Sequence, residues 1–209
     1  MSGNNAVYPL VTYCDEALMF TRMIDAHIQC FENLKALEAI VTKTGALLLK
    51  TLRNGGKILV CGNGGSASDA QHFAAEIVGR FEKERRAFPA IALTTDSSIL
   101  TAIANDYDYT QVFSRQVEGL GTPKDMLLGI STSGQSANVI MAVQKARAMG
   151  MGTIGLLGKD GGALKALVNE AVVVSDATTA RVQEGHIFIL HYWAWQIENG
   201  LIEQQESQP

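Results

Sequence analysis

The chain has few cysteines and no long apolar run. Its 209 residues include three cysteines, Cys14, Cys30 and Cys61, without a C-x-x-C spacing, and an odd number argues against a disulfide framework. Reduced thiols in a cytoplasmic protein are the simpler interpretation. No apolar run reaches the roughly 18 residues that a membrane span needs. The N-terminus also lacks the charged region and apolar core of a signal peptide. We therefore expect a cytoplasmic protein that does not associate with a membrane.

Basic residues are fewer than acidic residues. The 17 lysines and arginines are outnumbered by 21 aspartates and glutamates, which gives a formal net charge of −4 at pH 7. No cluster of basic residues is present, so the chain lacks the electrostatic signature of a protein that binds nucleic acid directly. Its length suits one domain, or one domain with a helical extension.

Short apolar runs alternate with helical patterns after residue 56. These runs are uniformly apolar, which is typical of a parallel sheet covered by helices on both faces. Residues 12–53 come before them and carry apolar side chains at helical spacings, and Asn33 could cap a second helix there. We expect this N-terminal helical arm to take part in oligomer formation, and we expect the whole chain to be an α/β protein. The predicted strands are residues 57–60, 90–93, 126–130, 153–157 and 171–174.

The most informative stretch is residues 60–80, V-C-G-N-G-G-S-A-S-D-A-Q-H-F-A-A-E-I-V-G-R. After the first predicted strand, Gly62, Gly64 and Gly65 allow backbone angles that a β-carbon forbids. A helix follows this turn. Its backbone N–H groups and the positive end of its dipole point at one small volume, which suits an anion such as phosphate. The candidate N-cap residues of this helix are Ser66, Ser68 and Asp69.

A second loop of similar character follows the third predicted strand. Residues 131–136, S-T-S-G-Q-S, offer four hydroxyl groups before a helix but no lysine, so the loop is not a P-loop. It could hold a phosphate through neutral donors, or it could be a solvated serine-rich turn. Both loops lie at the carboxyl ends of strands, where parallel α/β sheets bind ligands, so we expect them to form one site.

Histidine is rare, with four residues in the chain. His72 and Glu76 stand at i and i+4 on one helix face, where they could share a metal ion, divide a proton transfer or form a surface ion pair. His191 lies in the last predicted helix, eight residues after Gln183, and could equally be a core residue. On an ideal helix these two are about 80° apart around the axis and about 12 Å apart along it, so His191 is the better metal ligand.

Two further polar segments allow more than one interpretation. Asp106 follows Asn105 in a predicted loop at a strand end, where it could bind a sugar hydroxyl or cap a turn. Residues 80–86 are rich in charge, and we expect them to form a surface segment.

Four motifs together resemble the sugar-isomerase (SIS) domain family and, within it, the phosphoheptose isomerases. The likeness covers about residues 12–203. It implies one SIS domain over residues 1–209, with a helical arm at about 12–53 and an α/β core at about 57–203. It also implies a flavodoxin-like three-layer sandwich around a five-stranded parallel sheet, and a homotetramer with active sites between subunits. The motifs are C-G-N-G-G-S-A-S-D-A-Q-H-F-A-A-E, L-T-T-D-S-S-I-L-T-A-I-A-N-D-Y-D-Y, G-I-S-T-S-G-Q-S-A-N-V-I and R-V-Q-E-G-H-I-F-I-L-H.

The resemblance also implies a reaction and the residues that carry it. The reaction interconverts sedoheptulose 7-phosphate and D-glycero-D-manno-heptose 7-phosphate through an enediol, and it leads to heptose for lipopolysaccharide or related surface glycans. Glu76 and His191 match the proton-transfer pair of the family. The positions that match its ligands for one zinc ion per subunit are His72, Glu76, Gln183 and His191. Those that match its phosphate and sugar contacts are Asn63, Gly64, Gly65, Ser66, Glu76, Asn105, Asp106, Ser131, Thr132, Ser133, Ser136 and Gln183.

Two non-enzymatic alternatives share this fold. Some relatives are adaptors that bind the replication initiator protein, and others are modules that sense sugar phosphates. The adaptors have lost the positions that match Glu76 and His191, and a sensor needs only the phosphate loops. This chain keeps both residues, which favours the enzyme. One departure from some family members is Ala180, where they carry an acidic residue, although other members also have alanine there.

Overall fold

A five-stranded sheet forms the centre of the structure, a computed structural model that describes the backbone of residues 13–206 and the side chains of residues 18–202. All neighbouring strands are parallel, and their order is β2-β1-β3-β4-β5. This is the flavodoxin-like order, which reverses direction between β1 and β3. The predicted parallel sheet is confirmed. The strands are β1 (Ile58–Cys61), β2 (Ala90–Ala92), β3 (Met126–Ser131), β4 (Gly152–Gly158) and β5 (Glu170–Val174).

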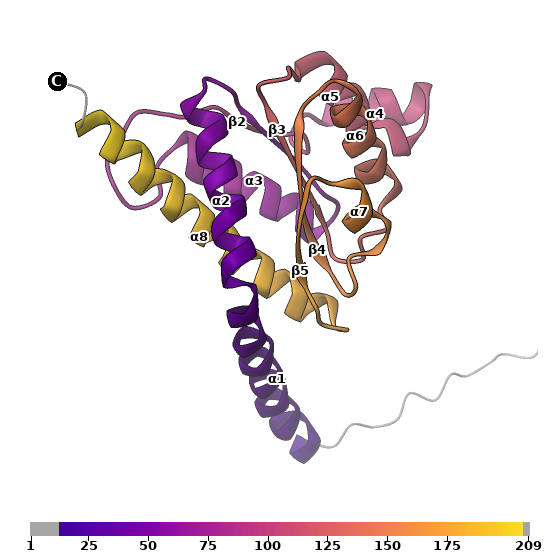
Figure 1. The fold of residues 1–209 in the computed structure, drawn as a ribbon. Coiled ribbons are helices and arrows are strands. Elements are labelled where there is room, and N and C mark those ends of the chain that lie inside the picture. Colours follow the sequence, from indigo (N-terminus) through magenta and orange to yellow (C-terminus); the bar gives the residue numbers. More distant parts are fainter. Residues whose placement is uncertain (1–12, 207–209) are drawn as a thin grey trace, which may run out of the picture.

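Helices cover both faces of this sheet and complete the three layers (Figure 1). One face carries α2, α3 and α8, and the opposite face carries α4, α5, α6 and α7. The predicted α/β sandwich is therefore confirmed. The helices are α1 (Tyr13–Leu34), α2 (Glu38–Arg53), α3 (Gly65–Val78), α4 (Ser97–Asp106), α5 (Ser114–Leu120), α6 (Ala137–Ala148), α7 (Gly162–Leu167) and α8 (Thr179–Glu206).

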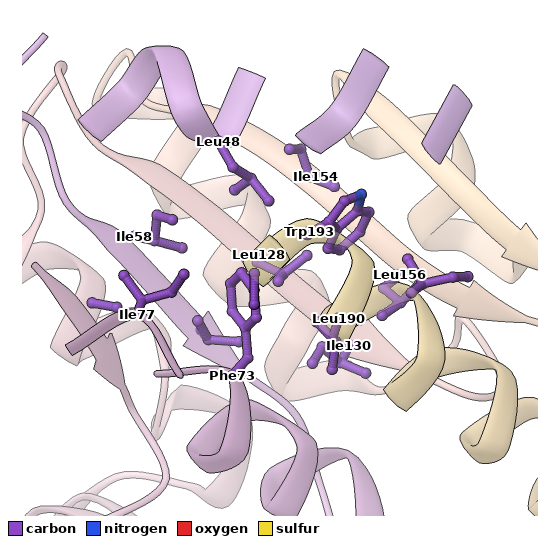
Figure 2. Close-up of a cluster of buried hydrophobic side chains, with 14 of the residues drawn as sticks. Leu48, Ile58, Phe73, Ile77, Leu128, Ile130, Ile154, Leu156, Leu190 and Trp193 are labelled. Carbon is purple, nitrogen blue, oxygen red and sulfur yellow. The ribbon is translucent and has the colours of Figure 1, made fainter. Parts of the chain in front are cut away.

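Alternate side chains of each strand enter two separate cores, as the pleat of a β-strand requires. In β1, Ile58 and Val60 belong to the core beneath α2, α3 and α8, whereas Leu59 belongs to the core on the other face. Trp193 of α8 is fully buried in the first core, and its ring centroid lies 6.4 Å from that of Phe73 (Figure 2). Burial on both faces explains why the strands are apolar along their whole length.

The boundary between α1 and α2 differs from the sequence prediction. α1 continues through Asn33, and a 3-10 turn at Lys35–Leu37 joins it to α2. The side chain of Asn33 accepts a hydrogen bond from Gln29 Nε2 at 3.2 Å, one turn earlier in the same helix. The predicted N-cap role of Asn33 is therefore wrong, because its side chain is engaged within α1.

α4 extends further along the chain than the sequence predicts. Asp96 is the N-cap residue, and its carboxylate accepts the N–H of Ile99 at 2.9 Å. Asn105 and Asp106, predicted to lie in a loop, form the last turn of α4, and the helix stops at Tyr107. The predicted loop at this position is therefore wrong. Helix boundaries depend on packing that local sequence does not encode.

α1 extends away from the sheet as an arm (Figure 1). Contacts with α8 hold it: His27 Nδ1 lies 2.7 Å from Glu184 Oε2, and Arg181 donates to the carbonyl of Met23 at 2.6 Å. Among the helices of residues 13–206, none combines the length and apolar character needed to cross a membrane. A row of apolar side chains on the arm is between 43% and 68% exposed: Leu18, Met19, Phe20, Met23, Ile24 and Ile28.

Candidate functional site

The turn after β1 is shaped by close approach of its own backbone. A Cβ atom on Gly62 would lie 2.8 Å from Cβ of Ser66, so only glycine fits there. Gly64 has a φ of +56° and is the N-cap residue of α3, which begins at Gly65. Ser66 is buried, and its N–H donates to the carbonyl of Asn63 at 3.0 Å. The predicted N-cap role of Ser66, Ser68 and Asp69 is therefore wrong, because the glycines let the helix start earlier.

The loop after β3 is held by its own hydroxyl groups. Ser131 Oγ and Ser136 Oγ lie 2.9 Å apart, and the N–H of Gly134 donates to Ser131 Oγ at 3.1 Å. Gly134 has a φ of +64°, and a Cβ atom there would lie 2.0 Å from the carbonyl oxygen of Gly161. Thr132 and Ser133 are half-buried. The loop is therefore a shaped turn that leads into the N-terminus of α6.

The two loops meet through a pair of amides. Asn63 Nδ2 donates to Asn138 Oδ1, and Asn138 Nδ2 donates to Asn63 Oδ1, both at 2.8 Å. Asn138 is buried in the first turn of α6, where its Oδ1 also accepts the N–H of Val139 at 3.0 Å. Because β1 and β3 are neighbours, the loops lie on either side of the point where the strand order reverses. Ligands of open α/β sheets bind at such a point.

A cluster of two imidazoles and one carboxylate joins α3 to α8. His72 Nε2 lies 2.9 Å from Glu76 Oε1 and 3.1 Å from His191 Nε2. One ligand atom from each of the three residues lies within 4.8 Å of the others. The side chain of His72 is 46% exposed and that of Glu76 is 23% exposed, so solvent and small molecules can reach them.

Burial affects the titration of two groups around this cluster. Burial and the neighbouring His72 lower the pKa of His191, while Glu76 acts in the opposite direction. The imidazole of His191 is therefore neutral near pH 7 and can accept a proton. Asp69 lies one turn before His72, and burial raises its pKa to about 6, although His72 opposes the change. Its Oδ2 is buried without a hydrogen-bond partner among the described residues.

Imidazole nitrogens and a carboxylate oxygen are donors that bind a divalent transition-metal ion. In this cluster they come from two helices, and one ligand atom of each residue lies within 4.8 Å of the others. The donor set and its spacing therefore fit a metal ion held between α3 and α8.

Known proteins are similar to this chain in sequence and in fold. Residues 22–158 match the SIS domain family. The phosphoheptose isomerase of Helicobacter pylori (strain P12) is 54% identical over 160 residues, which are 77% of this chain and 83% of that protein. That of Trichlorobacter lovleyi is 51% identical over 181 residues, 86% and 92% of the two chains. The structure of phosphoheptose isomerase from Neisseria gonorrhoeae matches with a TM-score of 0.84 and 43% identity, over 88% of this chain and 98% of that one.

This chain belongs to the phosphoheptose isomerase family. The family resemblance seen in the four motifs is confirmed, and so is the assignment to an enzyme family. The SIS fold of these isomerases is the sandwich described above.

Other residues predicted from the phosphoheptose isomerase motifs lie in two different settings. The amide of Gln183 lies against the turn after β1, since a Cβ atom on Gly65 would be 2.1 Å from Gln183 Nε2. Asn105 and Asp106 are exposed at the end of α4, and Asn105 Nδ2 donates to Asp106 Oδ1 at 2.8 Å. No hydrogen bond of the described residues links these two to the loops or to the histidine cluster.

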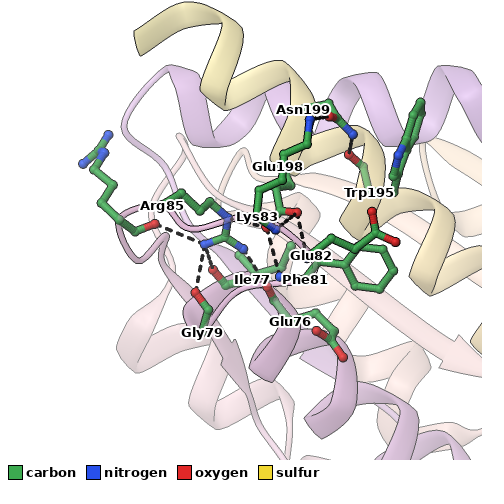
Figure 3. A network of polar contacts seen from close by, with 11 residues as sticks. Glu76, Ile77, Gly79, Phe81, Glu82, Lys83, Arg85, Trp195, Glu198 and Asn199 are labelled. Atoms are coloured by element: carbon green, nitrogen blue, oxygen red, sulfur yellow. Dashed lines mark hydrogen bonds and ion pairs between the residues drawn. The ribbon is translucent and has the colours of Figure 1, made fainter. Parts of the chain in front are cut away.

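A buried arginine beside this site could not be predicted from the local sequence. Residues 80–86 were expected to form a charged surface segment, yet the side chain of Arg85 is only 1% exposed and pairs with Glu198 of α8 at 3.1 Å. This expectation is wrong for Arg85, because α8 folds over the segment (Figure 3). A buried arginine within a run of charges has the same local signature as a solvated one.

Proposed function

We propose that this protein is a phosphoheptose isomerase that interconverts sedoheptulose 7-phosphate and D-glycero-D-manno-heptose 7-phosphate through an enediol. The observation that carries the proposal is the position of the His72–Glu76–His191 cluster. His72 and Glu76 lie on α3, the helix that leaves the turn after β1, and His191 reaches them from α8; that turn is joined to the hydroxyl loop after β3. The named isomerases of H. pylori and N. gonorrhoeae are 54% and 43% identical to this chain over most of their length.

The phosphate group would be bound by the loop after β3. Ser131, Thr132, Ser133 and Ser136 offer hydroxyl groups, and the N-terminus of α6 offers N–H groups and a partial positive charge. Neutral donors of this kind can hold a phosphate without a lysine. The turn of residues 63–66 would bind the sugar beside it, together with Gln183. Asn105 and Asp106 are proposed as further sugar contacts.

Glu76 and His191 would transfer the protons. An aldose–ketose exchange moves one proton between C1 and C2, and a second proton between the oxygens on the same two carbons. We assign the carbon proton to the carboxylate of Glu76, which removes it from C1 of the ketose and returns it to C2. His191, with its lowered pKa, would exchange the proton of the oxygens. The protein ends each turnover in the protonation state in which it began.

His72, Glu76, Gln183 and His191 would hold one zinc ion per subunit. When bound, zinc would supply Lewis-acid chemistry at the carbonyl oxygen of the sugar. The two imidazoles and one carboxylate support this assignment, because they are the donors typical of catalytic zinc sites.

We further propose a cytoplasmic homotetramer with active sites between subunits. The apolar face of α1 supports it, because exposed apolar surfaces of this extent mark protein interaction sites. Beside the arm, Phe188 and Tyr192 of α8 line a groove of about 390 Å³ between α1, α2 and α8. Phe20→Glu should dissociate the tetramer, as seen by analytical ultracentrifugation, whereas the exposed control Arg22→Glu should not. A Phe20→Glu variant that stays tetrameric would remove α1 from the interface.

The activity is tested by incubating purified protein with sedoheptulose 7-phosphate, with and without a chelator. We expect the heptose aldose to form, and we expect its formation to stop after chelation and to return with added Zn²⁺. A protein that leaves the ketose unchanged when loaded with Zn²⁺ is not this isomerase. Product formation that is indifferent to the chelator would remove zinc from the mechanism.

A further inference from the structure

A strap of residues 79–89 connects α3 to β2 and is fastened to α8 by one carboxylate (Figure 3). Glu198 accepts the backbone N–H groups of Phe81 at 2.9 Å, Glu82 at 2.8 Å and Lys83 at 2.9 Å. Successive N–H groups that converge in this way form an anion-binding concavity. Burial acts to raise the pKa of Glu198, but these donors and Arg85 outweigh it and hold the pKa below its usual value. Glu198 is therefore a buried anion at neutral pH.

Arg85 supplies the counter-charge and also closes the end of α3. Its Nε donates to Glu198 Oε1 at 3.1 Å, and both side chains are 1% exposed. The last carbonyls of a helix lack partners within the helix, and a cation there is favoured by the helix dipole. The guanidinium donates to four carbonyl oxygens, those of Glu76 at 2.7 Å, Ile77 at 3.0 Å, Gly79 at 3.1 Å and Arg86 at 3.1 Å.

These contacts reach the histidine cluster from two sides. Arg85 binds the backbone carbonyl of Glu76, the residue whose side chain faces His72. The strap places the ring of Phe81 beside His191, with ring centroids 5.8 Å apart and planes inclined by 34°. Glu198 lies seven residues after His191, two turns along the same helix and on nearly the same face. One end of the ion pair, Arg85, is thus hydrogen-bonded to the end of the helix of Glu76, and the other end, Glu198, belongs to the helix of His191.

We propose that Arg85 and Glu198 are positioning residues that set the distance between Glu76 on α3 and His191 on α8, and that Phe81 is the part of the strap that orients the imidazole. The inference rests on the proposed isomerase function. A small displacement of reacting groups lowers rates strongly, since catalysis depends on groups held within a fraction of an ångström. Neither Arg85 nor Glu198 needs to touch the sugar for this role.

A second ion pair, in which the carboxylate is buried and the lysine side chain is 23% exposed, provides a control. Lys57 Nζ donates to Asp125 Oδ2 at 2.6 Å, and the carboxylate of Asp125 also accepts N–H groups of the backbone. Lys57 and Asp125 precede β1 and β3, so they lie at the amino edge of the sheet, opposite the site. Loss of either carboxylate should destabilise the fold, because Glu198→Gln leaves the buried charge of Arg85 without its partner and Asp125→Asn weakens charged hydrogen bonds. Only loss of the Arg85–Glu198 pair should change the histidine cluster.

The experiment compares Glu198→Gln, Phe81→Leu and Asp125→Asn with the wild-type chain, well below the unfolding temperature of each. It measures Zn²⁺ affinity by competition with a chelator, the visible absorption spectrum after Co²⁺ loading, and kcat and KM for sedoheptulose 7-phosphate. For Glu198→Gln we expect Zn²⁺ affinity and kcat to fall by about 10–100-fold, the range for groups that orient metal ligands, with little change in KM. Phe81→Leu, which keeps the backbone donor to Glu198, should shift the Co²⁺ spectrum.

Asp125→Asn should unfold at a lower temperature but keep the wild-type spectrum, affinity and kcat. The inference is overturned if Glu198→Gln loses stability as Asp125→Asn does but keeps wild-type Zn²⁺ affinity and Co²⁺ spectrum. Should Glu198→Gln fail to fold, an unchanged spectrum in both Phe81→Leu and Arg85→Lys would overturn it equally. A wild-type chain that binds Zn²⁺ but does not isomerise the ketose would refute the proposed function, and the metal measurements would still decide the positioning role.

Discussion

Asp69 and Asp125 lie at opposite edges of the sheet and have opposite surroundings. At the amino edge, Asp125 accepts hydrogen bonds from Lys57 and Thr122 through their backbone and side-chain groups. Burial acts to raise its pKa, but these donors hold the pKa below the usual value. At the carboxyl edge, Asp69 has one oxygen without a partner among the described residues, and burial raises its pKa to about 6.

The difference shows how the two edges use their polar groups. The amino edge satisfies its buried carboxylate completely, which stabilises the fold. At the carboxyl edge, the side chains of His72, Glu76 and His191 pair with one another and with no other side chain among the described residues. Groups left in this state are available to a ligand, and sites of function often carry such a cost in stability. Substitutions at the carboxyl edge should therefore affect activity, and those at the amino edge should affect stability.

The largest effect is expected at Glu76. Glu76→Gln should lower kcat by roughly 10³-fold, within the range for a general base, because an amide cannot accept the carbon proton. Unfolding temperature and oligomeric state should remain as in the wild type. Steady-state kinetics with sedoheptulose 7-phosphate checks the rate. Normal turnover by Glu76→Gln would show that Glu76 is not the base. It would also contradict the proposed difference between the two edges of the sheet.

His191 tests whether metal and activity depend on the same group. His191→Ala should lose bound metal and isomerase activity together, because one of the imidazoles of the cluster is gone. Elemental analysis of the purified variant, next to an assay, measures both. His186→Gln is the contrasting variant, because His186 is buried against the carbonyl of Leu157 and should affect stability rather than metal content. Full metal content in His191→Ala would show that the cluster is not the metal site.

The amino edge should respond in stability alone. Asp125→Asn should lower the free energy of unfolding by about 2 kcal/mol and the Tm by roughly 4–8 °C, because charged hydrogen bonds to Lys57 and Thr122 are weakened. In the wild type this stabilisation is present above the usual Asp pKa of 3.8 and is lost as the pH falls below it. Calorimetry at pH 7 and pH 3 measures the difference, which should shrink at pH 3. A fall in kcat at pH 7 would contradict the separation of the two edges.

Asp69 should show the smallest effect, with the opposite sign. Its pKa is raised when folded, so the native state binds more protons than the unfolded state between pH 3.8 and about 6, and wild-type stability falls as the pH rises through this window. Metal-free Asp69→Asn should not lose stability in this way, because asparagine does not ionise. It should gain on the order of 1 kcal/mol relative to the wild type between pH 4 and pH 7, a figure reduced for partial solvent screening. Urea titrations at several pH values measure the free energy of unfolding of both proteins. If the difference between the wild type and Asp69→Asn does not change with pH, the raised pKa of Asp69 is contradicted.

The sheet and its loops could be predicted because their signals are local. Uniformly apolar runs predict the positions of the strands. Gly62 and Gly64 mark a turn that only glycine can form. His72 and Glu76 could be paired from their helical spacing. The approach of His191 to His72 could not be predicted from spacing, because it depends on how α8 crosses α3.

Other features depend on contacts between distant segments and left no local signal. Asn138 meets Asn63 across 75 positions, and Arg85 is buried only because α8 covers the strap. α3 starts earlier than its three candidate capping residues predict, because the glycines before them open the helix. At that point the geometry of the glycine turn, and not the capping preference of the residues after it, decides where the helix begins.

The proposed reaction needs a base that exchanges its proton with water while it moves hydrogen between two carbons. The most direct test follows the reaction of sedoheptulose 7-phosphate in D₂O by NMR. Because the side chain of Glu76 is 23% exposed, we predict that the aldose carries solvent deuterium at C2. Aldose that contains no solvent deuterium at C2 at any stage of conversion would contradict proton transfer by Glu76 through an enediol.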